Sequence, residues 1–221
     1  MTDILLVCEG ETDIYVFEGL TTHLASPLKL LPLSPQKDAT SGKYPPHGSG
    51  EVINWCKANA KKLQMFIDFH GSKALFIQLD TDAAPQVYRN CTHSSARKCC
   101  EERLNQIFGT QHAPDRCHYI LPTQNTETWL LASLETTETD DNGNAINNYE
   151  LITDTEERLI ARGYPSKKGV VNKRKLDKKP AKKYKEKYTP QLKENLDTAR
   201  TRCAELDKLC HLLQTIAPQQ A

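Results

Sequence analysis

Acidic side chains follow two apolar runs of the sequence, at the point where each run ends. Glu9 comes directly after the run 4–8, and Asp80 and Asp82 come directly after the run 74–79. Carboxylate oxygens are the ligands that the hard cations Mg²⁺ and Mn²⁺ prefer in proteins. Two aspartates separated by one residue can both turn toward one ion where the chain bends. The spacing therefore predicts a shared metal site suited to phosphodiester chemistry, in which one or two ions neutralise charge that develops on a phosphate.

Further acids near these runs have two interpretations each. Glu127 follows the apolar run 117–121, whereas Glu11 and Asp13 lie just after Glu9. A glutamate from a neighbouring strand can ligate an ion or serve as general acid/base. Glu11 and Asp13 can equally well sit in the first turn of a helix, where the helix dipole favours negative charge.

These acids fall at one edge of a predicted parallel α/β sheet. Short continuous apolar runs alternate with segments of helical periodicity, a pattern typical of a sheet covered by helices. The working groups of such sheets gather beyond the carboxyl ends of the strands. The predicted strands cover 4–8, 28–33, 74–79 and 117–121, and the predicted helices cover 13–25, 51–69, 94–108, a short segment from 126, 154–162 and 190–216.

Charge is distributed unevenly along the chain. The formal net charge is +1, from 29 Lys and Arg against 28 Asp and Glu, yet the window 166–193 alone carries +10 and the remainder carries −9. Blocks of one sign are informative where totals are not. The basic window is either a solvated charged surface or a strip that holds a phosphate backbone with little base specificity. Its interleaved tyrosines could stack on unpaired bases: Tyr164, Tyr184 and Tyr188.

Composition disfavours several classes of protein. No apolar run approaches the roughly 20 residues of a membrane helix, and no basic segment precedes the first apolar run as in a secretory signal, so we expect a cytoplasmic protein without membrane contact. Eight cysteines without paired spacing favour free thiols over disulfides or a zinc site. The segment 41–43 (SGK) lacks the rest of a Walker A motif, so ATP hydrolysis is not expected. His47, in the same loop, is either catalytic or part of a plain flexible loop.

The acidic motifs together resemble those of a Toprim domain, the metal-dependent module of topoisomerases, primases and OLD-type nucleases. The segments that carry the resemblance are 6–13 (LVCEGETD) and 79–82 (LDTD), because the family pattern is an apolar strand ending in Glu-Gly and a later strand ending in Asp-x-Asp. The segment 127–130 (ETWL) is similar to the Glu-x-Trp-Leu segment of short stand-alone bacterial Toprim proteins. The resemblance implies a Toprim-like Rossmannoid sheet of about four strands over 1–135 and a helical, lysine-rich extension over 136–221.

The resemblance also implies roles for individual residues. Glu9 would act as general acid/base or metal ligand, Asp80 and Asp82 would bind Mg²⁺ or Mn²⁺, and Glu127 would bind a second ion, with Asp13 as a further ligand. OLD-type nucleases place a lysine near the metal, where it stabilises negative charge in the transition state. The spacing does not choose among the candidates for that lysine, which are Lys178, Lys179 and Lys183. The remaining basic residues would bind the nucleic-acid backbone: Lys167, Lys168, Lys173, Arg174, Lys175, Lys182 and Lys185.

The function implied by the resemblance is a Mg²⁺-dependent nuclease that cleaves DNA or RNA. The chain has no room for the tyrosine-bearing domain of a topoisomerase or for the extra modules of a primase. The family context implies an effector of anti-phage defence that works with a separate ABC-type or AAA ATPase. Two alternatives stay open: a non-catalytic nucleic-acid-binding subunit of such a complex, and a metal-dependent nucleotide-sugar transferase. The leucine stripe within 190–216 is compatible with core packing and with the pairing of two copies.

Overall fold

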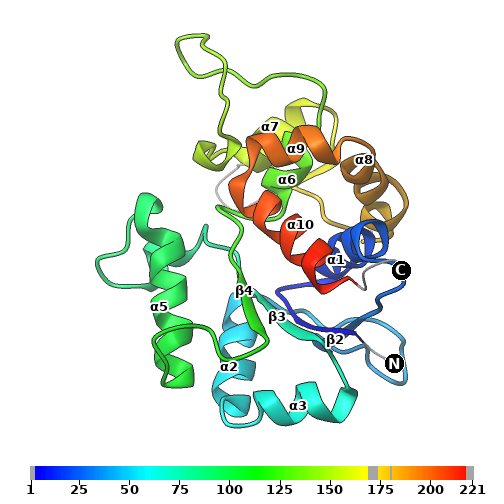
Figure 1. Ribbon diagram of the computed structural model, residues 1–221. Helices are drawn as coiled ribbons and strands as arrows, with labels where there is room; N and C mark the ends of the chain where they lie inside the picture. Colours follow the sequence, from blue (N-terminus) through cyan, green and yellow to red (C-terminus); the bar gives the residue numbers. More distant parts are fainter. Residues whose placement is uncertain (1–2, 169–173, 180, 218–221) are drawn as a thin grey trace.

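A parallel sheet forms the centre of the protein (Figure 1). The computed structural model describes residues 3–168, 174–179 and 181–217. Four strands lie in the order β2-β1-β3-β4, and each pair of neighbours is parallel. Their bounds are β1 Ile4–Val7, β2 Leu30–Ser34, β3 Ala74–Gln78 and β4 Cys117–Ile120. The predicted α/β class with about four parallel strands is therefore confirmed.

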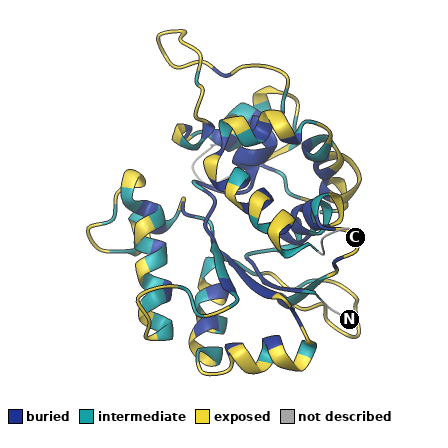
Figure 2. Cartoon of the chain, in the orientation of Figure 1, coloured by how far each residue is buried: buried dark blue, intermediate teal, exposed yellow. Residues whose placement is uncertain are grey.

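Alternate residues of the two central strands face opposite sides of the sheet, and each side has its own apolar cluster. Leu5 and Leu75 face the side covered by α2 (Ser49–Asn59), α3 (Leu63–His70) and α5 (Ala96–Phe108). The other side is covered by α1 (Glu11–Leu24) and by helices from the C-terminal part of the chain. Figure 2 shows buried residues along the strands and on the inner faces of these helices. Burial on both faces explains why the strands read as continuous apolar runs.

Two predicted long helices are each divided in the structure, so those two predictions were wrong. The segment 51–69 forms α2 and α3, and Figure 1 shows α3 running across the direction of α2. The segment 190–216 forms α8 (Thr189–Glu194), α9 (Leu196–Arg202) and α10 (Ala204–Ile216). Cys203, between α9 and α10, has extended dihedral angles of φ −134° and ψ 104°. The apolar positions keep helical spacing across these breaks, so periodicity alone does not reveal them.

The prediction of a helical, lysine-rich extension was wrong for the first part of the lysine-rich segment. Its first part forms two short antiparallel strands, β5 (Ser166–Lys168) and β6 (Arg174–Leu176). A π-helical turn over Tyr184–Tyr188 then leads into α8. The remaining elements are α4 (Ala84–Val87), α6 (Glu127–Ala132), α7 (Thr155–Ala161) and 3₁₀ turns at His93–Ser95 and Tyr149–Leu151.

The C-terminal part of the chain shares an apolar core with the sheet. Leu192 and Leu206 belong to the same buried cluster as Ile4, Phe17 and Trp129. Helices α7 to α10 thus pack against α1 or α6. A domain boundary at residue 135 stays a prediction. Within the described residues, none of the helices combines the length and the apolar character needed to span a bilayer.

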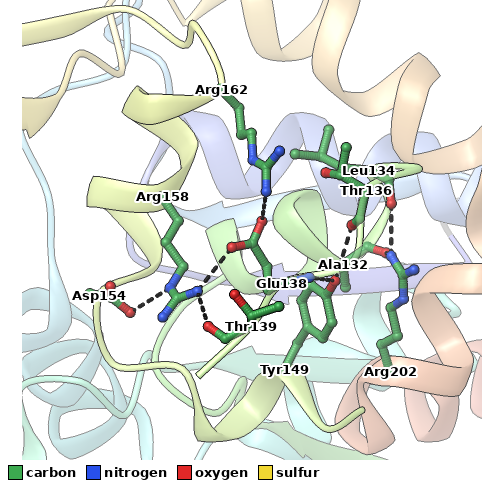
Figure 3. Close-up of polar contacts among 10 residues, drawn as sticks. All are labelled: Ala132, Leu134, Thr136, Glu138, Thr139, Tyr149, Asp154, Arg158, Arg162 and Arg202. Atoms are coloured by element: carbon green, nitrogen blue, oxygen red, sulfur yellow. Dashed lines mark hydrogen bonds and ion pairs between the residues drawn. The ribbon is translucent and has the colours of Figure 1, made fainter. Parts of the chain in front are cut away.

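A buried ionic network holds the segment that follows α6 (Figure 3). The Glu138 side chain is 6% exposed and accepts hydrogen bonds from Arg158 (2.9 Å) and Arg162 (2.8 Å). Arg202 donates to two backbone carbonyls at the end of α6, at 2.8 and 2.7 Å, and its guanidinium lies 4.9 Å from the ring centre of Tyr149. These contacts fix the C-terminal end of α6, whose first residue, Glu127, belongs to the acidic site described below.

The close approach of α1 to α8 depends on Gly19. A methyl group at Gly19 would overlap the methyl group of Thr189, whereas one at Gly50 in α2 would meet no atom. We expect Gly19→Ala to lower the free energy of unfolding by about 1–3 kcal/mol, because overpacking forces the two helices apart. The matched control Gly50→Ala should raise it by up to about 1 kcal/mol through helix propensity. Urea denaturation measures both changes, and equal stability of the two variants would contradict the proposed close contact.

Candidate active site

The acids after β1 and β3 are held together by a ring of hydrogen bonds. The two strands are adjacent and parallel, with Val7 opposite Ile77, so the residues that follow them meet at the carboxyl edge of the sheet. The backbone N–H of Asp80 donates to Glu9 Oε1 at 2.8 Å. The backbone N–H of Glu9 donates to the side-chain oxygen of Gln78 (3.0 Å), and the Gln78 amide donates to Asp80 Oδ1 (2.7 Å). The fold thus fixes Glu9 and Asp80 side by side.

A third carboxylate joins this edge from α1. Asp13 lies in the first turn of α1, is 5% exposed, and accepts a hydrogen bond from the Thr126 hydroxyl at 2.8 Å. Thr126 directly precedes α6, so the contact also joins the N-terminal ends of α1 and α6. The first-turn position of Asp13 agrees with the simpler interpretation of this acid. Its burial beside other acids makes it a candidate ligand as well.

Glu127 is the most deeply buried of the site's acids and is held by two residues of the C-terminal segment. Its side chain is 0% exposed. The Tyr184 hydroxyl donates to Glu127 Oε1 at 2.8 Å, and Lys178 Nζ lies 2.8 Å from Glu127 Oε2. Lys178 Nζ also lies 3.9 Å from Glu156 Oε1 on α7. The lysine-rich segment therefore supplies the cation that neutralises Glu127.

The proximity of these groups shifts their protonation equilibria. Burial and the neighbouring Asp13 carboxylate raise the pKa of Glu9 to about 8. Burial and the Glu127 carboxylate raise the pKa of Asp13 to about 6. Burial, followed by the Glu9 carboxylate, raises the pKa of Asp80 well above its ordinary value. Burial alone would lower the pKa of Lys178, but Glu127, Asp80 and Asp13 together raise it.

Asp82 lies at the rim of the site and is exposed. Its backbone N–H donates to the carbonyl of Gln124 at 3.0 Å, and the N–H of Thr81 donates to the same carbonyl at 2.9 Å. The loop after β3 is thereby joined to the segment after β4. Asp82 also lines a cavity of about 250 Å³ together with Glu156 and Lys175. Glu9 and Asp80, by contrast, are half-buried.

The donor chemistry of the cluster fits a hard divalent cation. Its oxygens come from the carboxylates of Glu9, Asp13, Asp80, Asp82 and Glu127. In Glu9, Asp13 and Asp80, the side-chain hydrogen bonds among the described residues engage one carboxylate oxygen each. Within the described ranges, no three His, Cys, Asp or Glu side chains form a ready-made metal cage.

Of the three lysines predicted as catalytic candidates, Lys178 is the one that the fold brings to the acids. Lys179 and Lys183 are exposed and form no ion pair with the site's acids among the described residues. Several predicted backbone-binding residues are also exposed: Lys167, Lys168, Lys175, Lys182 and Lys185. Lys182 pairs with Glu186, and Lys185 lies over the Tyr15 ring. Lys173 lies outside the described residues, and Arg174 is placed by its backbone in β6.

The predicted stacking of tyrosines on bases was wrong for Tyr184 and Tyr188. They are only 1% and 4% exposed, and Tyr164 stacks on Tyr188 with ring centres 4.5 Å apart. Tyr184 instead donates a hydrogen bond to Glu127. The sequence did not indicate this contact because 57 positions separate the two residues. His47 bonds to the Ser34 hydroxyl (2.8 Å) at the end of β2 rather than to the acids.

Comparison with known proteins gives no relative of this chain. No known family, curated protein or solved structure matches it. The resemblance to Toprim domains therefore rests on the three short motifs at 6–13, 79–82 and 127–130.

All eight cysteines, which lie in the described ranges, are free thiols.

The raised carboxyl pKa values make stability depend on pH. The ordinary pKa of Glu9 is 4.5, and its folded value is about 8. The folded state thus holds this proton, and that of Asp13, more tightly than the unfolded chain does. The contribution of Asp13 is present in full below its ordinary pKa of 3.8 and is lost as the pH rises through about 6. The contribution of Glu9 is present in full below pH 4.5 and is lost as the pH rises through about 8. In EDTA, we expect the free energy of unfolding to fall by about 2 kcal/mol as the pH rises from 5 to 8.

Thermal and urea denaturation at several pH values measure this slope. Glu9→Gln should flatten it, whereas the exposed control Glu135→Gln should leave it unchanged. A wild-type profile that is level between pH 5 and 8, or a profile of Glu9→Gln as steep as that of the wild type, would disprove the assignment.

The Lys178–Glu127 ion pair should be essential for stability. Lys178→Met leaves the Glu127 carboxylate buried without a cation, so we expect a loss of about 2–3 kcal/mol, less than for a fully buried pair because Lys178 is partly exposed. The neighbouring control Lys179→Met should change stability by less than about 0.5 kcal/mol. Adding Glu127→Gln to Lys178→Met should recover most of the loss. Urea denaturation of the four proteins measures these differences, and a stable Lys178→Met single variant would refute the argument.

Proposed function

We propose that this protein is a Mg²⁺- or Mn²⁺-dependent nuclease that hydrolyses phosphodiester bonds of DNA or RNA. The observation that carries the proposal is the gathering of Glu9, Asp13, Asp80 and Glu127 from separate segments around Lys178 at the carboxyl edge of the sheet. Burial and the neighbouring carboxylates raise the pKa of these groups, and a bound cation would stabilise their ionised forms in place of the protons. Carboxylate oxygens select a hard ion.

Each group of the cluster has a distinct task in this proposal. Asp80 and Asp82 would hold the first ion, and Glu127 and Asp13 would hold a second. The bound cations supply charge neutralisation at the phosphate. Glu9 would accept the proton of the attacking water, because hydrogen bonds fix it beside Asp80 at the carboxyl edge of the sheet.

Lys178 is the proposed source of further positive charge at the reacting phosphate. Its side chain is 35% exposed, so the ammonium group can reach a phosphate oxygen while it stays close to Glu127. Tyr184 holds the other oxygen of Glu127 and keeps that carboxylate in place. The exposed lysines of β5 and β6 would bind the nucleic-acid backbone without reading its sequence.

The motif resemblance extends the proposal beyond the site. On that basis the fold is of the Toprim type, the protein is cytoplasmic, and it acts as a defence effector regulated by a separate ABC-type or AAA ATPase. An association of two copies would be compatible with this role.

Asp80→Ala should abolish metal-dependent cleavage. Purified protein is incubated with plasmid, single-stranded DNA and RNA in Mg²⁺ or Mn²⁺, and cleavage is followed on gels. We expect a loss of about 100-fold or more, because even the outer-sphere partners of a metal site commonly contribute 10- to 100-fold. The control Asp141→Ala removes an exposed acid far along the chain in the loop after α6 and should cleave as the wild type does. Mg²⁺ should also raise the melting temperature of the wild type but not that of Asp80→Ala.

The outcomes separate the candidate functions. Cleavage that persists in Asp80→Ala would refute the metal-site assignment. Absence of cleavage by every protein, with nucleic acid still bound in EDTA, would leave the non-catalytic binding subunit. Hydrolysis or transfer of a nucleotide sugar in place of nucleic-acid cleavage would support the transferase.

A further inference from the structure

A second cavity opens beside the acidic cluster on the opposite side from the C-terminal helices. It has a volume of about 320 Å³, is lined by residues of α2, α4 and α5, and includes Asp80 in its wall. This volume lies near the lower end of the range of about 300–1,000 Å³ typical of pockets for small ligands. Figure 1 shows α2 and α5 on the same side of the sheet, near β4. We call this cavity the α2–α5 pocket.

The walls of the α2–α5 pocket are mainly apolar. Ile53 comes from α2, Leu79 from the end of β3, and Val87 and Tyr88 from α4 and its C-terminal end. Val87 is 64% exposed although it is aliphatic. An open apolar wall beside an aromatic ring suits a flat, weakly polar group, which can stack on the tyrosine and cover the valine.

Two cations line the same pocket. Neither Lys57 on α2 nor Arg103 on α5 forms an ion pair with an acid in the described part of the chain. Arg103 donates to the neutral side chain of Gln106 at 3.1 Å. Lys57 lies about two helical turns, or about 11 Å, along α2 from Gly50, the residue near the start of that helix that also lines the pocket. These cations therefore offer an anion site within the pocket.

One ligand class combines these features. A nucleotide has a flat base that suits the apolar walls and a phosphate that suits Lys57 and Arg103, and guanidinium groups bind phosphate in a two-pronged manner. Asp80 belongs both to the pocket and to the acidic cluster, so a nucleotide seated here lies next to the proposed site of cleavage.

We propose that the α2–α5 pocket binds the phosphorylated terminal nucleotide of a nucleic-acid strand, with the base between its apolar walls and the terminal phosphate on Lys57 and Arg103. The inference rests on the proposed nuclease function for its choice of ligand source, because a strand end seated there places the next phosphodiester bond toward Asp80. The same chemistry would accept a free mononucleotide, and the experiment distinguishes the two.

Binding without cleavage tests this proposal. The probes are internally labelled single-stranded DNA and RNA oligonucleotides with a 5′-phosphate, a 3′-phosphate or only hydroxyl ends, and fluorescence anisotropy in EDTA measures their dissociation constants. We expect one of the phosphorylated forms to bind about tenfold more tightly than the hydroxyl form. Lys57→Gln and Arg103→Gln should remove that preference. The control Lys61→Gln, which removes the same charge from an exposed position outside the pocket, should keep it.

Three results would overturn the proposal or part of it. Equal binding of all three forms by the wild type, or an unchanged preference in both pocket variants, would refute the pocket as a phosphate site. Adenosine monophosphate that binds through Lys57 and Arg103 without displacing the oligonucleotide would refute the strand end in favour of a free nucleotide.

Cleavage is measured separately, with Mg²⁺. Cleavage of all strands without any terminal preference would refute the pocket proposal and would still support the nuclease function. A terminal preference in EDTA without cleavage in Mg²⁺ would refute the nuclease function and leave the pocket as a binding site. Thermal unfolding of each variant confirms that the substituted protein is folded.

Discussion

The buried carboxylate of Glu127 is the interaction on which the rest of the structure depends. A fully buried charge is stable only when a cation and hydrogen bonds accompany it. Both of its partners, Lys178 and Tyr184, come from the C-terminal segment. The lysine-rich part of the chain must therefore close over α6 for the fold to be stable, and its first role is to neutralise an acid within its own chain. The network around Glu138 supports the same helix at its other end.

The acids at the carboxyl edge are close together because the parallel pairing of the strands places their carboxyl ends side by side. Adjacent parallel strands bring Glu9 and Asp80 to one place, and the first turn of α1 adds Asp13. Burial, and after it mutual repulsion, raises the pKa of Glu9 and of Asp13, and the apolar clusters on both faces of the sheet offset this cost. Clusters of perturbed carboxyl groups of this kind are characteristic of functional sites. A cation or an incoming phosphate with its counterions would relieve the repulsion.

The near-neutral net charge is the sum of acidic and basic residues that occupy separate regions of the structure. The acidic cluster contacts the basic segment through Lys178, while the exposed lysines of β5 and β6 remain open to solvent. On the other side, the α2–α5 pocket adds Lys57 and Arg103 beside Asp80. Positive charge thus lies on two sides of the carboxylates, and the proposed nucleic-acid substrate would need it there, because the acids alone would repel a phosphate backbone.

The sequence by itself determined the central strands and the acids that follow them, because a strand buried on both faces is a local, continuous apolar run and its carboxyl end is where Glu9 and Asp80 stand. It did not determine the breaks at 60–62 and at Cys203, since the apolar spacing continues across them. Only the tertiary structure selected Lys178 among equivalent lysines and buried Tyr184 against Glu127. Those choices depend on contacts between distant parts of the chain, and no local pattern of charge or hydropathy encodes which lysine will meet a particular carboxylate.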